Sequence, residues 1–131
     1  ESACKGAKIM KILIIEDNAS NMKLVSNILK MSGYKVLQAG DAETGIAMVK
    51  DKAPDLILMD VQLPGMDGLA ASRLLKSDEA TKHIPIIAMT AFAMKGDMEK
   101  AKEAGCNEYI SKPFNYQQFL ELIKTFCPEL S

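Results

Sequence analysis

The apolar run at residues 56–59 constrains the fold of this chain more than any other stretch. It is too short for a buried helix, and it lies between Pro54 and the turn-forming pair Pro64-Gly65. An apolar run without polar alternation is typical of a strand buried on both faces, as in a parallel sheet covered by helices. Asp60 ends this strand, at the sheet edge where open α/β folds place their ligands. We therefore expect Asp60 to act as a nucleophile.

Further apolar runs alternate with helical patterns along the chain. Strands are predicted at residues 12–15, 36–37, 56–59, 86–89 and 109–111. Helical spacing of apolar residues follows each strand, at residues 21–32, 42–53, 68–75, 91–104 and 116–126, with Asp41 and Asn115 as N-cap residues. Such alternation favours βαβ units with right-handed crossovers. The sequence therefore predicts a doubly wound, flavodoxin-like (βα)5 fold of the α/β class, with a five-stranded parallel sheet flanked by helices.

Composition and charge narrow the class of protein. At 131 residues, with 48% hydrophobic and 25% charged residues, the chain has the size and composition of one globular domain. A formal net charge of −1 offers no field that would attract nucleic acid or an anionic membrane, and no apolar run reaches membrane-span length. No stretch resembles a signal peptide, and the scattered Cys4, Cys106 and Cys127 are typical of reduced thiols in a cytoplasmic protein. We expect a flexible leader over residues 1–10, one domain over residues 11–127 and a tail over residues 128–131.

Polar residues follow four of the predicted strands at the point where each strand ends. They are Glu16 and Asp17 after the first strand, Asp60 after the third, Thr90 after the fourth and Lys112 after the fifth. Because the carboxyl ends of parallel strands meet at one edge of a sheet, we expect these side chains to lie close together. Any one of them would as readily be an ordinary residue where the chain meets water. Four coincident strand ends favour a functional site.

Three carboxylates, an ammonium group and a hydroxyl at one edge indicate phosphoryl chemistry. The carboxylates repel one another unless a cation lies between them, and all-oxygen ligands suit a hard divalent ion such as Mg²⁺. His83 is the single histidine and no cysteine stands among these strand ends, so zinc is not expected. A divalent ion and Lys112 would neutralise phosphoryl oxygens while a carboxylate attacks phosphorus in line. Asp60 is the candidate for that attack, which would form an aspartyl-phosphate.

Five stretches of the chain resemble the receiver domain of two-component response regulators. They are residues 15–18 (Ile-Glu-Asp-Asn), 54–60 (Pro-Asp-Leu-Ile-Leu-Met-Asp), 63–68 (Leu-Pro-Gly-Met-Asp-Gly), 88–91 (Ala-Met-Thr-Ala) and 109–114 (Tyr-Ile-Ser-Lys-Pro-Phe). Their order and spacing are those of the family, and the resemblance covers residues 11–126. It implies a phospho-accepting receiver of a phosphorelay. Residues 91–97 and 109–113 are also similar to the stand-alone DivK type of regulator.

The resemblance implies a role for each acidic residue at this edge. Asp60 would accept the phosphoryl group, and Asp17 would bind Mg²⁺ directly. Glu16, in place of the commoner aspartate, would bind the ion largely through water. The main-chain carbonyl of Gln62 would complete the ligands, and Mn²⁺ would serve in place of Mg²⁺. Such a protein is a phosphoacceptor with self-catalysed phosphorylation and slow loss of the phosphoryl group, not an enzyme.

The resemblance also implies a conformational switch. Lys112 would pair with the phosphoryl group, and the bond between Lys112 and Pro113 is expected to be cis. Thr90 would donate its hydroxyl to the phosphoryl group, and the small Ala91 would leave room for the phosphoryl oxygens. Movement of Thr90 would open space into which the ring of Tyr109 rotates. A half-buried tyrosine in a strand is also explained by the fit of aromatic side chains to a sheet.

Two groups of residues are candidates for contacts with other proteins. The first group, expected to dock a sensor histidine kinase or a histidine phosphotransfer protein, lies beside the acidic pair and comprises Asn18, Asn21, Met22 and Phe114. The second belongs to an apolar run that cannot all face inward on a helix, which makes Phe92 and Met94 candidates for binding a downstream protein target. An ordinary solvated helix surface explains the first group equally well.

Three other interpretations stay open at this point. The chain could be a receiver domain excised from a hybrid histidine kinase or from a multidomain regulator. An aspartyl-phosphate phosphatase would want a second acid two residues past the nucleophile, where Gln62 stands. A flavodoxin-like cofactor binder would want a phosphate-cradling loop after the first strand, where Glu16 and Asp17 stand instead.

Overall fold

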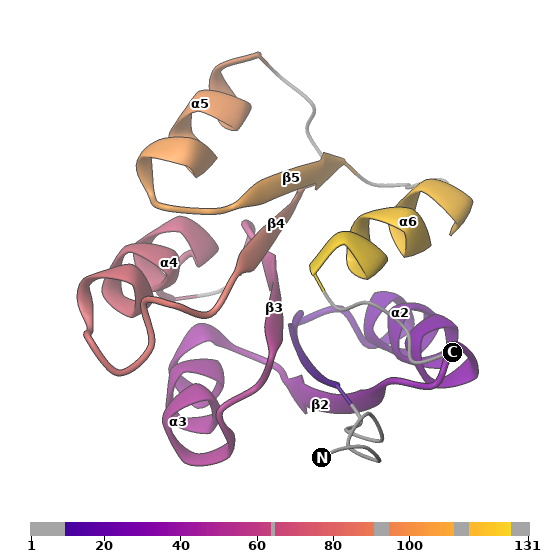
Figure 1. The fold of residues 1–131 in the computed structure, drawn as a ribbon. Coiled ribbons are helices and arrows are strands. Elements are labelled where there is room, and N and C mark those ends of the chain that lie inside the picture. The colour runs from indigo at the N-terminus through magenta and orange to yellow at the C-terminus, as the bar shows by residue number, and fades with distance from the viewer. Residues whose placement is uncertain (1–9, 64, 91–94, 112–115, 127–131) are drawn as a thin grey trace.

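The computed structural model describes residues 10–63, 65–90, 95–111 and 116–126, without the side chains of residues 95–97 and 116. Within these ranges it contains five strands and five helices (Figure 1). The strands are β1 (Lys11–Ile15), β2 (Lys35–Ala39), β3 (Leu56–Asp60), β4 (Ile86–Thr90) and β5 (Glu108–Ser111). The helices are α2 (Ala19–Met31), α3 (Ala42–Lys52), α4 (Gly68–Ser77), α5 (Lys95–Glu103) and α6 (Tyr116–Phe126).

The strands form one parallel sheet in the order β2-β1-β3-β4-β5. From β1 the chain moves outward to β2, then crosses back past β1 to β3 and continues in the other direction. This reversal is the topological switch point of a doubly wound sheet, where such folds place their functional groups. The predicted (βα)5, flavodoxin-like fold is therefore confirmed.

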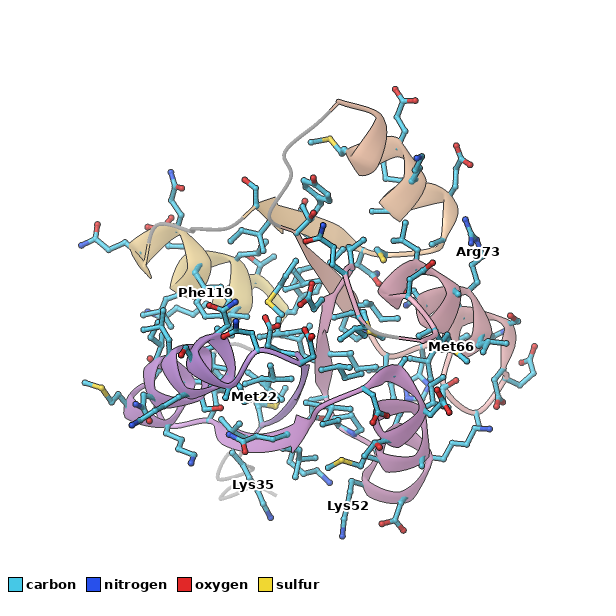
Figure 2. The ribbon with its side chains drawn as sticks, turned by 180° about the vertical axis from the view of Figure 1, so that it is seen from behind. Met22, Lys35, Lys52, Met66, Arg73 and Phe119 are labelled. Carbon is cyan, nitrogen blue, oxygen red and sulfur yellow. The ribbon has the colours of Figure 1, made fainter. Side chains whose placement is uncertain are left out.

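Helices cover both faces of the sheet, with α2 and α6 on one face and α3, α4 and α5 on the other (Figure 1). Successive strand residues point to opposite faces, so Ile14 packs in the layer with Phe119 while Ile15 packs in the other layer. Figure 2 shows Phe119 on the side of α6 that faces α2. The sheet is therefore held between two apolar layers.

The central strand β3 explains why an uninterrupted apolar run was needed. All of Leu56–Asp60 is buried, because helices cover both faces of the sheet at this position. Each fully buried side chain of this size contributes roughly 1.5–3 kcal/mol. The edge strand β2 differs: it runs from Lys35 to Ala39, beyond the predicted residues 36–37, because Lys35 and Gln38 form strand backbone while their side chains stay exposed.

Capping side chains set the start of the helices that follow β1, β2 and β3. Asp41 and Asp67 each accept a hydrogen bond from the main-chain amide three residues later, at 2.7 Å and 2.8 Å. The predicted cap at Asp41 is confirmed, while Asn115 lies outside the described residues. α2 begins at Ala19 rather than at residue 21, because Asn18 is its N-cap and accepts from the amide of Asn21 at 3.0 Å. No helix in the described part of the chain is long and apolar enough to cross a membrane.

Candidate functional site

The carboxyl edge of the sheet, where β1, β3 and β4 end, collects polar side chains from separate parts of the sequence. Ile15 is the last residue of β1 that pairs with β3, and Glu16 follows it beside Asp60. On the other side of β3, Thr90 ends β4 and pairs with Ser111, the last residue of β5. The predicted convergence of strand ends is therefore seen for every one of these residues that the structure describes.

Three acidic side chains meet at this edge and form what we call the carboxylate cluster: Glu16, Asp17 and Asp60. One carboxylate oxygen from each lies within 4.8 Å of the others. Glu16 and Asp60 are almost completely buried, with exposed fractions of 2% and 3%, whereas Asp17 is exposed. The cluster is therefore open to solvent on the Asp17 side and enclosed by protein on the other.

Main-chain amides orient the two buried carboxylates of the cluster. The amide of Gln62 donates to Oδ1 of Asp60 at 2.9 Å, and the amide of Asn18 donates to Oε2 of Glu16 at 3.2 Å. Both donors follow their acceptor by two residues, so the loops after β3 and β1 hold these side chains locally. Each hydrogen bond restricts the rotation of the carboxylate that accepts it.

The donor set of the carboxylate cluster fits a hard divalent cation. Three carboxylate oxygens within 4.8 Å of one another suit Mg²⁺. This ion prefers oxygen ligands, keeps several of its waters and takes few protein carboxylates. The main chain of Gln62 passes beside Asp60, and its side chain is exposed. Glu16, Asp17 and Asp60 are thus the residues that would hold the ion. The expected ligand role of the Gln62 carbonyl stays a prediction.

Thr90 and Tyr109 lie on the same face of the sheet, the one covered by α3, α4 and α5. Thr90 shares that face with Ala88, two residues earlier, and Tyr109 pairs with Ala88 and packs against the same core. Thr90 is buried and Tyr109 is half-buried. A cavity of about 90 Å³ between α5 and β5 is lined by Tyr109 and, on α5, by Met98 and Ala101. Tyr109 is therefore one of the residues that border this cavity.

Two side chains with shifted pKa values, Cys106 and Lys76, lie toward the amino edge of the sheet, where the strands begin. Burial raises the pKa of the Cys106 thiol, which donates to Oγ of Ser72 at 3.5 Å and stays protonated near neutral pH. Burial lowers the pKa of Lys76, whose ammonium group donates to the carbonyl of Ile84 at 2.7 Å. Both groups therefore serve the packing of the domain, and neither is placed to act with Asp60.

The structure describes some of the predicted site residues and not others. Those outside the described residues are Ala91, Phe92, Met94, Lys112, Pro113 and Phe114. Of the residues expected to contact a kinase or phosphotransfer protein, Asn18 is exposed, while Asn21 and Met22 are half-buried in the first turn of α2. Met22 is labelled in Figure 2. Asn18 has a local task as the N-cap of α2, which explains its presence without a partner.

Sequence reasoning missed one residue that touches this site. Gly68, the first residue of α4, packs against the main chain of Asp60 so closely that a Cβ atom would lie 2.1 Å from the Asp60 carbonyl oxygen. In the sequence, Gly68 begins the predicted helix 68–75 and ends the family-like stretch 63–68, but neither pattern predicts its contact with Asp60. Which main-chain atoms that helix start touches depends on tertiary packing.

Two comparisons of sequence identify relatives. Residues 12–124 match the sequence profile of the response regulator receiver domain. The polar-differentiation response regulator DivK of Brucella ovis is 45% identical over 115 residues, which cover 88% of this chain and 94% of that protein. The match therefore extends over nearly all of the sheet and its helices.

Solved structures show the same fold. The receiver domain of a sensor histidine kinase from Pseudomonas aeruginosa, described with a magnesium ion coordinated in its active site cleft, has a TM-score of 0.85 at 33% identity and covers 93% of this chain and 100% of its own. A chemotaxis response regulator of Vibrio cholerae has a TM-score of 0.86 at 26% identity and covers 91% of this chain and 99% of its own. The architecture is shared with receiver domains over nearly their full length.

Proposed function

The chain belongs to the response regulator receiver domain family and is similar to DivK, and from this premise we propose that Asp60 is the phospho-accepting residue of a two-component phosphorelay. The donor is the phosphohistidine of a sensor histidine kinase or of a histidine phosphotransfer protein. One observation carries the proposal: carboxylate oxygens of Glu16, Asp17 and Asp60 lie within 4.8 Å of one another at the carboxyl edge.

The charge of the carboxylate cluster supports a cation-dependent role. Holding three like charges together, two of them buried, costs free energy that no packing need of the sheet explains. Asp17, Asp60 and the carbonyl of Gln62 would hold Mg²⁺, and Glu16 would act largely through water. When bound, the ion neutralises charge on the phosphoryl oxygens during transfer.

In the transfer, Asp60 acts as the nucleophile. A bond forms between a carboxylate oxygen of Asp60 and phosphorus while the phosphorus–nitrogen bond of the donor phosphohistidine breaks, and the leaving nitrogen takes up a proton. The hydrogen bond from the amide of Gln62 restricts the carboxylate to one rotation, which lowers the entropy cost of in-line attack. Lys112 pairs with the phosphoryl group, and Ala91 leaves room for its oxygens.

The modified site signals through Thr90 and Tyr109. Thr90 donates its hydroxyl to the new phosphoryl group, and the space that its movement opens admits the ring of Tyr109. The shared face of the two side chains and the cavity beside Tyr109 support this coupling. The readout is a changed surface for a downstream protein partner, with Phe92 and Met94 as candidate contacts.

Incubation with acetyl phosphate and Mg²⁺, followed by intact-mass measurement, tests the proposed function. The expected result is the gain of one phosphoryl group that persists for seconds or longer. A phosphatase would instead hydrolyse acetyl phosphate continuously without accumulating label, and a flavin binder would do neither. Absence of any labelled protein at millimolar acetyl phosphate and Mg²⁺ would contradict the proposal.

A further inference from the structure

Gly68 makes the closest approach that any described glycine makes to the protein backbone. A Cβ atom at Gly68 would lie 2.1 Å from the carbonyl oxygen of Asp60, 2.9 Å from its carbonyl carbon and 2.9 Å from Cα of Val61. Contacts shorter than 3.0 Å essentially do not occur for real Cβ atoms. The atoms in the way belong to the main chain, so no side-chain rotation relieves the contact.

Backbone conformation does not explain a glycine at this position. Gly68 is the first residue of α4 and does not have a positive φ, so its backbone is one that alanine adopts readily. In a free helix alanine would be the better residue, because glycine loses more conformational freedom on folding. The lack of room beside Asp60 is therefore what requires glycine here.

Other glycines of the chain provide a contrast. A Cβ atom at Gly45 would meet the side chain of Ile15 at 2.4 Å, and one at Gly105 would meet the side chain of Lys76 at 2.8 Å. In both cases the nearest atoms belong to side chains, whereas those beside Gly68 belong to the main chain. Gly40 has nothing within 4 Å. Crowding against backbone is confined to Gly68 among the glycines that the structure describes.

The backbone that Gly68 touches carries the site. Gly68 donates its amide to the carbonyl of Val61 at 3.1 Å, and Val61 donates to the carbonyl of Met89 at 2.8 Å, so the start of α4 is tied to the end of β3. Oδ1 of Asp60 is held in turn by the amide of Gln62. A displacement of the Asp60 carbonyl therefore moves the Asp60 carboxylate and the main chain of Gln62 together.

The size of that displacement matters for ligand binding. Widening the contact from 2.1 Å to 3.0 Å requires a shift of at least about 0.9 Å, the difference of the two distances. Magnesium demands near-ideal octahedral geometry, and binding constellations lose function when their groups stray by more than roughly 0.5 Å. A shift of that size in the main chain of Asp60 would exceed what a magnesium site tolerates.

We propose that Gly68 is a positioning residue: by lacking a side chain it lets α4 start against the Asp60 carbonyl and so sets the placement of the Asp60 carboxylate and the Gln62 carbonyl around the cation. This inference rests on the proposed function for its consequence, phosphoryl uptake, but not for the placement itself. Gly68 touches neither cation nor phosphoryl group and acts through Asp60.

The variant G68A tests this role beside two controls. G40A adds a methyl group in open space, and V49A removes buried volume from the last turn of α3, toward the amino edge, so that it lowers stability away from the site. Each protein is titrated with Mg²⁺ alone while the amide resonances of Val61 and Gln62 are followed by NMR. The rate of labelling by acetyl phosphate is measured in parallel.

For G68A we expect shifted Val61 and Gln62 amide resonances before any Mg²⁺ is added, and Mg²⁺ affinity weakened about 10-fold or more, as is typical when a group supporting a ligand is disturbed. G40A and V49A should keep the wild-type affinity and the wild-type resonances at these two amides. Labelling of G68A should slow and recover in part at high Mg²⁺.

The result that would overturn the inference is a folded G68A with wild-type Gln62 resonance and wild-type Mg²⁺ affinity, or equal weakening in V49A. If G68A is unfolded, the titration is repeated in sucrose, which favours the folded state. A chain that stays unfolded there would make Gly68 a requirement of folding and also overturn the positioning role. The Mg²⁺ titration followed at the Gln62 amide needs no phosphoryl donor. Failure of the wild-type protein to be labelled would therefore contradict the proposed function without deciding the role of Gly68.

Discussion

The two edges of the sheet use polar side chains in opposite ways. At the amino edge, polar groups bond to the main chain: Asp55 accepts from the amide of Lys11 at 2.8 Å, and Asn107 accepts from the amide of Ile86 at 3.0 Å. At the carboxyl edge, carboxylates converge on one another in the cluster of Glu16, Asp17 and Asp60. The first arrangement satisfies main-chain donors, whereas the second brings like charges together, which repel one another.

This difference shows how to recognise the polar residues of an α/β domain that indicate a functional site. A charged side chain that satisfies a nearby backbone group is accounted for by folding alone. A set of like charges held together is not accounted for in this way, because the charges repel one another. Substitutions at the two edges should therefore separate stability from phosphoryl chemistry.

The largest expected effect is that of D60N, which should abolish labelling by acetyl phosphate while leaving the domain folded. In Mg²⁺-free buffer its free energy of unfolding should rise by about 1 kcal/mol, since like charges near 4 Å repel by roughly 1–4 kcal/mol at surface dielectric values. The matched substitution at the amino edge, D55N, should keep full labelling. Intact mass measures labelling, and urea unfolding measures the free energy of unfolding. Phosphoryl label on D60N would show that another residue is the acceptor.

The second prediction concerns the cation. At Mg²⁺ concentrations ten times the Kd, binding to the folded state should raise the free energy of unfolding by about 1.4 kcal/mol, and chelation should remove this gain together with labelling. D17N should lose most of the gain, because it removes a ligand from the cluster. Urea unfolding with and without Mg²⁺ measures it. An undiminished gain in D17N would place the cation away from the carboxyl edge.

The third prediction concerns the amino edge. D55A should lower the free energy of unfolding by roughly 1–3 kcal/mol, because the amide of Lys11 loses its acceptor at the start of β1. Its Mg²⁺ affinity should stay at the wild-type value. D51A is the control, since Asp51 is exposed and pairs only with the exposed Lys52 among the described ion pairs, so its removal should change stability by less than about 0.5 kcal/mol. Weakened Mg²⁺ binding in D55A would break the separation of the two edges.

The smallest expected effect is that of a substitution at Asp41. This residue follows β2 at the carboxyl edge, yet its carboxylate bonds to the main chain, as the polar side chains of the amino edge do. Its hydrogen bond from the amide of Thr44 at 2.7 Å lowers the pKa of Asp41 below its ordinary value of 3.8. The charged form therefore stabilises the folded state above about pH 4, and this contribution is lost as the pH falls through the lowered folded-state pKa. Asparagine keeps the cap without the charge.

Urea unfolding of wild type and D41N at pH 6, 4 and 3 measures that contribution. The wild type should be the more stable at pH 6, and the difference should shrink toward pH 3 while labelling at pH 7 is equal in both. A difference that grows as the pH falls would contradict the assignment of the shift to the N-cap.

The fold could be predicted where the determinants are local. The apolar run of β3 and the cap at Asp41 follow from sequence neighbours alone, and both are confirmed. The start of α2 could not be fixed, because Asn18 and Asn21 are equally good caps by residue type and only the folded backbone decides which one reaches an amide. The ends of β2 were missed because an edge strand tolerates exposed Lys35 and Gln38.

The candidate site was predictable to the extent that topology fixes it. Parallel strands bring Glu16, Asp60 and Thr90 to one edge whatever the details of packing, and the structure bears this out. The near-complete burial of Glu16 beside an exposed Asp17 was not predictable, since it depends on how α2 leaves β1. The contact of Gly68 with Asp60 likewise arises between elements and leaves no periodic signal.

The central claim is that Asp60, in the carboxylate cluster at the carboxyl edge, is the residue that accepts the phosphoryl group. Borohydride reduction tests it most directly, since an aspartyl-phosphate is reduced to homoserine, which peptide mapping locates by mass. After treatment with acetyl phosphate and Mg²⁺, the account predicts homoserine at position 60 and at no other aspartate. Homoserine at position 17 or 55, or phosphoryl label without homoserine at position 60, would contradict it.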